Sequence, residues 1–160
     1  MSAIASRITP FLWFDQNAEE AADFYISVFP NSRRLGALKT DFDNRNMPPK
    51  GKPLTVSFEL DGLRFTALNG GPAHARQFNE AISFVVSCET QAEIDDYWTK
   101  LLAGGGQEVA CGWLRDKFGL AWQIVPARIG ELLSKPAAMQ AMMQMKKLDI
   151  AALEEAGKSS

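Results

Sequence analysis

The sequence contains an internal repeat, a feature that constrains the fold of a chain more strongly than its composition does. Asn17 is followed three residues later by Glu20, and Thr90 is followed by Glu93, so a capping-box pattern occurs twice, 73 residues apart. An apolar helical face follows each pattern. Each half of the chain is therefore predicted to contain a helix that begins with the same signal.

Strands accompany the predicted helix in each half. Residues 11–14 precede the first helix and residues 84–87 the second, two β-type segments at the same spacing as the caps. Hairpin signals follow both helices, at residues 54–68 and 107–125. Each half therefore consists of a strand, a helix and an antiparallel set of strands.

The two hairpins also give a residue-level equivalence. Superposing the turn glycines Gly62 and Gly119 makes Thr66 equivalent to Gln123. Side chains alternate between the two faces of a strand, so Gln123 is predicted on the face opposite its bulky apolar neighbours. Ser83 is expected by the same alternation to lie with Gln123 and Thr66 on a concave face that can hold a ligand.

Two β-α-β-β-β modules predict an α+β fold with helices on one side of the sheets. We expect one domain over residues 1–160, with module one at about 8–72 and module two at about 80–126. A helical tail is predicted at about 128–156. It packs either on its own sheet or on a second subunit.

Composition excludes several classes of partner. The formal net charge is −2 and the pI is near 5.5, so no broad attraction to nucleic acid or anionic membranes is expected. No segment approaches the run of about 20 apolar residues needed to span a membrane, and the first residues lack a signal-peptide core. Cys88 and Cys111 are too few for a disulfide framework. The chain is predicted to be cytoplasmic, with two reduced thiols.

Five runs of residues resemble a known family. They are ITPFLWFDQNAEEAADFY, FTALNGGP, FNEAISFVVSCET, CGWLRDKFGLAWQIVP and MKKLDIAALEEA, and together they extend from about Ile8 to Ala156. These runs resemble the PhnB-like family, also labelled demethylubiquinone-type 3-methyltransferase, of the glyoxalase/bleomycin resistance/dioxygenase (vicinal oxygen chelate) superfamily. The resemblance implies curved sheets that form a cavity, commonly in a homodimer.

The resemblance also implies where a metal would bind. Metalloenzymes of the superfamily carry a Glu in the last strand of each module, and Thr66 and Gln123 stand at those positions here. A His typically opens the first strand, where this chain has Ala81 in module two and a residue near Ile8 or Thr9 in module one. Because sites for Zn, Fe or Ni are poor without imidazole or carboxylate, we expect no metal and no other cofactor, with a divalent metal as the alternative.

Other residues are weaker candidates for the ligand cavity. Glu80 could be a general base or a solvated strand-entry residue, and Asn69 belongs to an NGG run whose glycines allow either a sharp turn or ligand contact. Phe14 and Trp113 either stack on a planar ligand or pack in the core. His74, the sole histidine, is expected to be an exposed loop residue, and Cys111 a small apolar residue rather than a nucleophile.

Three functional classes remain open. The first is a protein or metal-independent enzyme that binds a small organic molecule in a cavity including Thr66, Ser83 and Gln123. The second is a divalent-metal-dependent lyase, isomerase or dioxygenase. The third is the methyltransferase of the family label, for which the chain lacks the expected Gly-rich turn between a strand and a helix of a parallel sheet.

Overall fold

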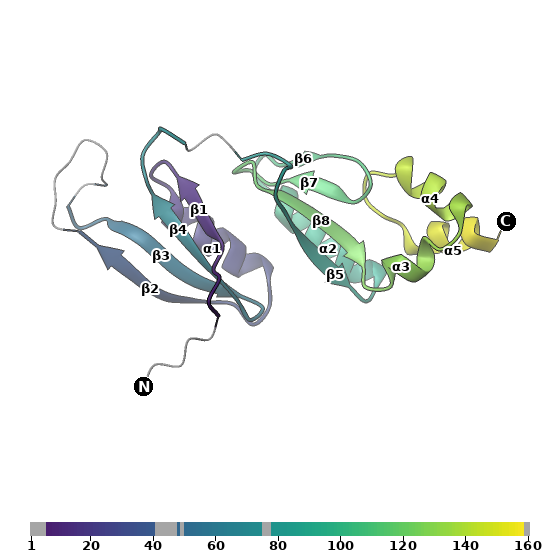
Figure 1. The fold of residues 1–160 in the computed structure, drawn as a ribbon, viewed down its shortest axis with the longest axis horizontal. Helices are drawn as coiled ribbons and strands as arrows, with labels where there is room; N and C mark the ends of the chain where they lie inside the picture. The colour runs from purple at the N-terminus through teal and green to yellow at the C-terminus, as the bar shows by residue number, and fades with distance from the viewer. Residues whose placement is uncertain (1–5, 41–47, 49, 75–77, 159–160) are drawn as a thin grey trace. The chain divides into compact units, whose positions relative to one another are not determined.

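A computed structural model describes residues 6–40, 48, 50–74 and 78–158 (Figure 1). The chain divides into two compact units, residues 1–77 and 78–160. Each unit contains one mixed four-stranded sheet.

The first unit has the predicted order of elements. They are β1 (Phe11–Phe14), α1 (Ala18–Val28), β2 (Arg33–Lys39), β3 (Pro53–Leu60) and β4 (Leu63–Asn69). The strand order in the sheet is β1-β4-β3-β2, with β1 parallel to β4 and the other pairs antiparallel.

The second unit repeats this order and adds three helices. Its elements are β5 (Ser83–Cys88), α2 (Gln91–Leu102), β6 (Gln107–Glu108), β7 (Trp113–Arg115), β8 (Ala121–Pro126), α3 (Ile129–Leu132), α4 (Pro136–Met143) and α5 (Ile150–Lys158). The sheet order β5-β8-β7-β6, with β5 parallel to β8, matches the first sheet strand for strand. The predicted α+β fold with two β-α-β-β-β modules and a helical tail is confirmed.

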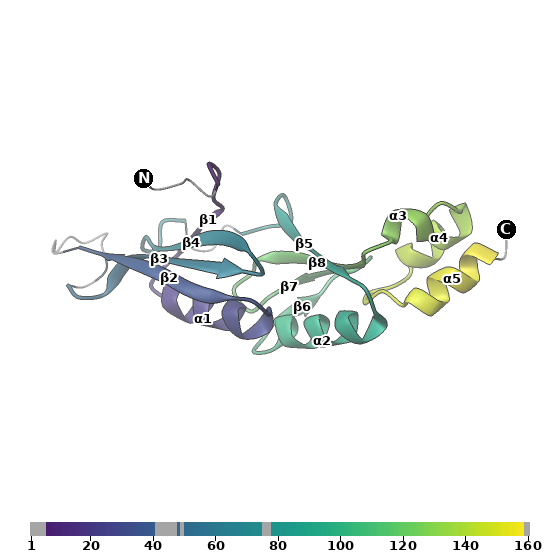
Figure 2. The same cartoon turned by 90° about the horizontal axis from the view of Figure 1, so that it is seen from below.

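One face of each sheet packs on its helix, and Figure 2 shows α1 and α2 along these faces. In the first unit the fully buried Val56, Phe58 and Ala67 belong to the α1 face. In the second unit Leu114 and Ile124 are equally buried on the α2 face. The side chains between them in sequence point to the opposite side, which we call the open face of each sheet.

The N-cap bond of the predicted capping box is confirmed for α2 but not for α1, and the Glu93 carboxylate accepts from the Glu89 N–H at 2.9 Å instead of the Thr90 N–H. Thr90 Oγ1 accepts a hydrogen bond from the Glu93 N–H at 3.2 Å, as the pattern predicts. Asn17 makes no such bond, because its backbone at ψ 28° is not the extended conformation of a capping residue. Asn69, at the end of β4, supplies the acceptor instead: its Oδ1 lies 2.9 Å from the Ala18 nitrogen.

The strand register corrects the predicted offset. Phe14 O accepts from the Gly70 N–H at 2.9 Å, and Cys88 O accepts from the Ala127 N–H at 2.7 Å. These matching bonds make Phe14 equivalent to Cys88, at an offset of 74 rather than 73, so the predicted pairing of Phe14 with Ser87 was wrong by one residue. The cause is a strand-to-helix turn of three residues in the first unit and two in the second.

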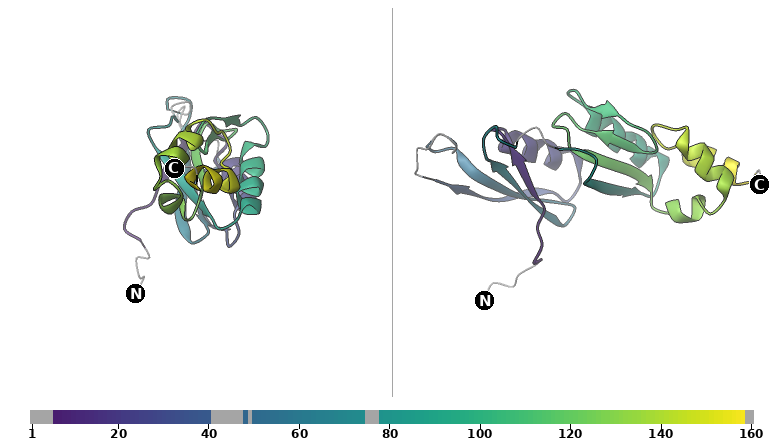
Figure 3. Two further views of the ribbon diagram at one scale, coloured as in Figure 1. Left: turned by 90° about the vertical axis from the view of Figure 1, so that its right-hand side faces the viewer. Right: turned by 45° about the horizontal axis from the view of Figure 1, so that its top comes forward.

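The tail packs on its own unit, and Figure 3 shows α3, α4 and α5 grouped together. Backbone N–H groups of Cys111 and Gly112 donate at 2.8 Å to the carbonyls of Met145 and Lys146. Gln91 on α2 holds the next turn of chain, because its amide donates to Leu148 O at 3.0 Å and accepts from the Ile150 N–H at 2.9 Å. Within the described residues, no helix is long and apolar enough to cross a membrane.

Candidate functional site

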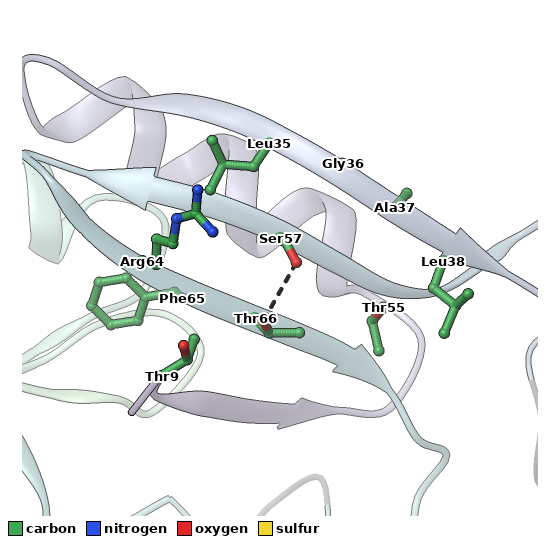
Figure 4. Close-up of a pocket in the computed structure, with 10 residues that line it drawn as sticks. All are labelled: Thr9, Leu35, Gly36, Ala37, Leu38, Thr55, Ser57, Arg64, Phe65 and Thr66. Carbon is green, nitrogen blue, oxygen red and sulfur yellow. Dashed lines mark hydrogen bonds between the residues drawn. The ribbon is translucent and has the colours of Figure 1, made fainter. Parts of the chain in front are cut away.

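A hollow of about 380 Å³ lies on the open face of the first sheet (Figure 4). Its walls come from β2, β3 and β4 and from the chain that enters β1. The lining residues are Thr9, Leu35, Gly36, Ala37, Leu38, Thr55, Ser57, Arg64, Phe65 and Thr66. Four of the ten carry hydroxyl groups and one carries a guanidinium, so the hollow combines apolar walls with a small set of polar groups.

Thr66 lies in the middle of this hollow, on β4. It pairs with Phe11 of β1 on one side and with Ser57 of β3 on the other. The Thr66 and Ser57 hydroxyl oxygens are 3.4 Å apart, and both side chains are half-buried. Because this hydrogen bond is long, both oxygens keep capacity for a ligand.

The second sheet brings Gln123 and Ser83 together on its open face. The Gln123 amide Nε2 donates to Ser83 Oγ at 2.9 Å, and both side chains are half-buried. At the offset of 74, Ser83 corresponds to Thr9, which lines the hollow of the first unit with Thr66. The two units therefore carry equivalent pairs of neutral polar side chains. The residue next to Gln123 is Ser83, not Ala81, which lies outside the strand.

Trp113 shares the open face with Gln123, because the two residues are directly opposite each other on β7 and β8. Its ring is half-buried. Gln123 thus has an aromatic residue as its cross-strand neighbour, a combination suited to a ring that carries a polar substituent.

Two candidates lie on the other side of the first sheet. Asn69 is fully buried on the α1 face, and its amide donates to Pro53 O at 2.9 Å while its Oδ1 caps α1. Phe14, 3% exposed, packs on the same face. Both side chains serve the core of the unit, because even-numbered positions of β1 and odd-numbered positions of β4 face the helix.

Glu80 forms an ion pair with Arg115. Its Oε1 lies 2.7 Å from the Arg115 Nε, although the contact does not have the direction of a good hydrogen bond. The Glu80 side chain is 39% exposed. A paired and solvated carboxylate has little reason to act as a general base.

Trp13 is a residue that the sequence reasoning missed. Its indole Nε1 donates to Gly71 O at 2.9 Å, and its ring meets His74 edge-on with centroids 4.9 Å apart. A second hollow, of about 370 Å³, is lined by Trp13, Gly70, Pro72 and Ala73. Gly70 is required here because a Cβ at that position would lie 2.4 Å from the indole ring. Strand alternation from the buried Leu12 would have indicated Trp13 instead of Phe14.

Neither cysteine has the surroundings of a nucleophile. Burial, with a smaller contribution from Glu93, raises the pKa of the Cys88 thiol to about 11. Cys111 is half-buried, and its backbone binds the tail. Within the described part of the chain, no group of three or more His, Cys, Asp or Glu side chains is placed to hold a metal ion.

The donor set at the predicted metal positions does not fit a transition metal. Around Thr66 and Gln123 the available donors are the neutral oxygens of Thr9, Ser57 and Ser83. Zinc, iron and nickel favour imidazole, thiolate or carboxylate ligands. We therefore derive no chemistry through a metal at these positions.

Comparison with known proteins identifies relatives of the chain. A model of the family described as 3-demethylubiquinone-9 3-methyltransferase matches residues 6–125. The solved structure of a protein from Bacillus cereus, described as a 3-demethylubiquinone-9 3-methyltransferase and PhnB protein, is 33% identical, with a TM-score of 0.66 over 75% of this chain and 99% of that one. Among curated proteins, none matches the sequence significantly.

Two further structures share the fold at lower identity. Protein PA1353 from Pseudomonas aeruginosa is 20% identical, with a TM-score of 0.61 over 76% of this chain and 98% of its own. The fosfomycin resistance protein FosX from Mesorhizobium loti is 14% identical, with a TM-score of 0.54 over 83% of this chain and 100% of its own.

Proposed function

Since the chain belongs to the PhnB-like family, described as 3-demethylubiquinone-9 3-methyltransferase, within the glyoxalase/vicinal oxygen chelate superfamily, we propose that it binds a small organic molecule on the open faces of its sheets without a metal. The observation that carries this proposal is the hydroxyl-lined hollow around Thr66. Apolar walls with a few fixed polar groups are the usual composition of a small-molecule site.

The second unit supports the same function with different chemistry. Gln123 can donate and accept at once, and its bond to Ser83 fixes the orientation of the amide. With Trp113 beside it, this face is suited to an aromatic or conjugated ring that bears a carbonyl or hydroxyl group.

The family description favours methyl transfer as a second candidate function. A nucleotide-type methyl donor is usually held by a Gly-rich turn between a parallel strand and a helix. Here the strand-to-helix turns are Asp15-Gln16-Asn17 and Glu89-Thr90, and neither contains a glycine. The described residues therefore favour binding over methyl transfer, and the donor set favours it over a metal-dependent lyase, isomerase or dioxygenase.

We also propose that the protein is a cytoplasmic homodimer. Ile8 and Ile82 are 83% and 70% exposed, and Phe11 and Val85 are 57% and 56% exposed. Each pair is related by the offset of 74. The same apolar positions at the edge strands β1 and β5 are thus exposed in both units, as expected of surfaces that a second copy covers. Two free cysteines are consistent with a reducing compartment.

A ligand screen tests the proposed function. A library of small aromatic and polar molecules would be screened by saturation-transfer NMR against the wild type and against Thr66→Val and Gln123→Leu. Hits that weaken about tenfold in either variant, the loss expected for one hydrogen bond to a ligand, support binding on the open faces. Ser27→Ala, on the exposed surface of α1, is the control. If hits bind all variants equally, or if no molecule binds, the proposal is wrong.

A further inference from the structure

We propose that the ligand of the first unit carries an oxyanion, a carboxylate, phosphonate or phosphate, which Arg64 binds at the edge of the hollow. This inference rests on the proposed function and adds the chemical class of the ligand. It starts from the charges of the hollow, which the hydroxyl groups alone do not explain.

Arg64 is an uncompensated cation. It is exposed, it lines the hollow, and it makes no ion pair or hydrogen bond through its side chain within the described residues. Glu59 is directly opposite Arg64 on β3, where a cross-strand ion pair would be expected. The Glu59 carboxylate instead pairs with Arg33, whose Nε lies 3.2 Å from Oε2. The carboxylate best placed to neutralise Arg64 is therefore engaged elsewhere.

The rest of the hollow favours an anion. None of its ten lining residues is acidic, and hydroxyls from Thr9, Thr55, Ser57 and Thr66 can each donate a hydrogen bond. A guanidinium presents several N–H donors in a fixed fork that matches the oxygens of a carboxylate or phosphate. In Figure 4 the Arg64 side chain rises from β4 beside the Ser57 and Thr66 pair, so one ligand can meet both kinds of donor.

The second unit lacks this arrangement. The position equivalent to Arg64 is Ala121, by the same offset that relates Thr66 to Gln123. The arginine on that face, Arg115, is paired with Glu80. Of these two arginines only Arg115 has an ion-pair partner among the described residues, so the two faces differ in ligand chemistry: an anionic group in the first and a neutral polar ring in the second.

The test is a titration of the ¹⁵N-labelled full chain with inorganic phosphate, methylphosphonate and acetate, followed through the amide signals of Thr9, Ser57 and Thr66. We expect saturable shifts confined to the hollow, weakened about tenfold or more in Arg64→Gln, as for loss of a charge-assisted bond. Arg128→Gln removes an equal charge from an arginine that pairs with Glu154, and should leave binding unchanged. Phosphate and methylphosphonate binding without acetate binding would assign a tetrahedral anion, and the reverse a carboxylate.

Other outcomes separate the two levels of the proposal. Equal weakening in Arg64→Gln and Arg128→Gln, or shifts spread over the surface, would mean nonspecific attraction and overturn the role of Arg64. In another outcome, neutral hits from the ligand screen occupy the hollow, and Arg64→Gln changes neither their binding nor the binding of the anions. The small-molecule function then stands, and the anion proposal fails. If neither anions nor neutral molecules bind, both proposals fail.

Discussion

Asp116 is a buried acid whose carboxylate has three hydrogen-bond donors around it. Only 3% of the residue is exposed. Oδ1 accepts from the N–H groups of Phe118 at 2.8 Å and Leu120 at 3.1 Å, and Oδ2 accepts from the Trp122 indole at 2.9 Å. The side chain therefore fixes both the turn that precedes β8 and the largest ring of that strand.

Replacing Asp116 by Asn should destabilise the protein by about 2–3 kcal/mol, because an amide turns an NH₂ donor toward an N–H that needs an acceptor. Chemical denaturation followed by tryptophan fluorescence measures the loss. Asp149→Asn is the matched control: Asp149 Oδ1 accepts from the Ala152 N–H at the exposed start of α5, where Asn caps equally well. Equal stability of the two variants would contradict the structural role of Asp116.

The two cysteines should differ sharply in reactivity. At pH 8 a disulfide reagent should modify Cys111 in the native protein and reach Cys88 only after denaturation, because the raised pKa and the 1% exposure of Cys88 suppress its thiolate. Cys111→Ser should remove the fast phase. Rapid modification of Cys88 in that variant would show that its environment is open.

Cys88 also gives a pH dependence with a definite sign. Its pKa rises on folding from an ordinary value of 9.0 to about 11, so the folded state keeps the proton to higher pH. The stabilisation from this group is complete below pH 9 and is lost as the pH approaches 11. The difference in unfolding free energy between wild type and Cys88→Ala should shrink over that interval. A constant difference would refute the assignment.

Strand alternation was enough to predict the neighbourhood of Gln123 and Ser83, because Gln123 is inside β8 and Ser83 opens β5 in regular register with it. It did not predict the roles of Asn69 and Trp13. Asn69 caps a helix 51 residues away, a contact that only the parallel pairing of β1 and β4 creates. Trp13 was missed because all four residues of β1 are apolar, so the sequence shows no alternation from which the buried face of this strand could be read.

At the level of elements, the helical tail is joined to the sheet and α2 of its own unit through the chain between α4 and α5. Leu148 is fully buried, and a Cβ added at Gly112 would lie 3.0 Å from its side chain. Leu148→Ala should cost about 2–4 kcal/mol and expose α4 and α5 to proteases, since it leaves a cavity at that contact. Met143→Ala, at a side chain 60% exposed, should change stability by less than about 0.5 kcal/mol. Equal protease sensitivity of both variants would mean that Leu148 does not anchor the tail.

The elements themselves could be predicted because their signals are local. Turn glycines, a capping-box pattern and an apolar period identified both modules, and α4 begins at Pro136, a residue favoured in the first turn of a helix. The sequence did not show that Gln91 ties α2 to the tail, because both of its partners lie more than 50 residues away. Such contacts depend on the tertiary fold, not on any local period.

For the whole molecule, the exposed apolar positions give a test of assembly. Light scattering coupled to size-exclusion chromatography should give the mass of two chains for the wild type. The double variant Phe11→Asp, Val85→Asp should give the mass of one, because charge at both edges opposes burial. Leu63→Asp, at a residue that is 48% exposed at the start of β4, is the control and should remain dimeric. A monomeric wild type would exclude the homodimer.

Neither Thr66 nor Gln123, at the equivalent positions of the two units, is a carboxylate or an imidazole. Their chemistry predicts how the whole protein responds to metals. Thermal melting of tag-free protein should not change with chelator or with added Zn²⁺, Ni²⁺, Mn²⁺ or Fe²⁺, because neutral Thr, Ser and Gln oxygens bind these ions weakly. The double variant Ser83→His, Gln123→Glu places an imidazole and a carboxylate at side chains that now touch at 2.9 Å. It should gain a rise in melting temperature with Zn²⁺ or Ni²⁺. A wild-type shift equivalent to more than about 2 kcal/mol at saturating ion would show that the open faces hold a metal through other ligands, and would restore the metal-dependent lyase, isomerase or dioxygenase as the better function.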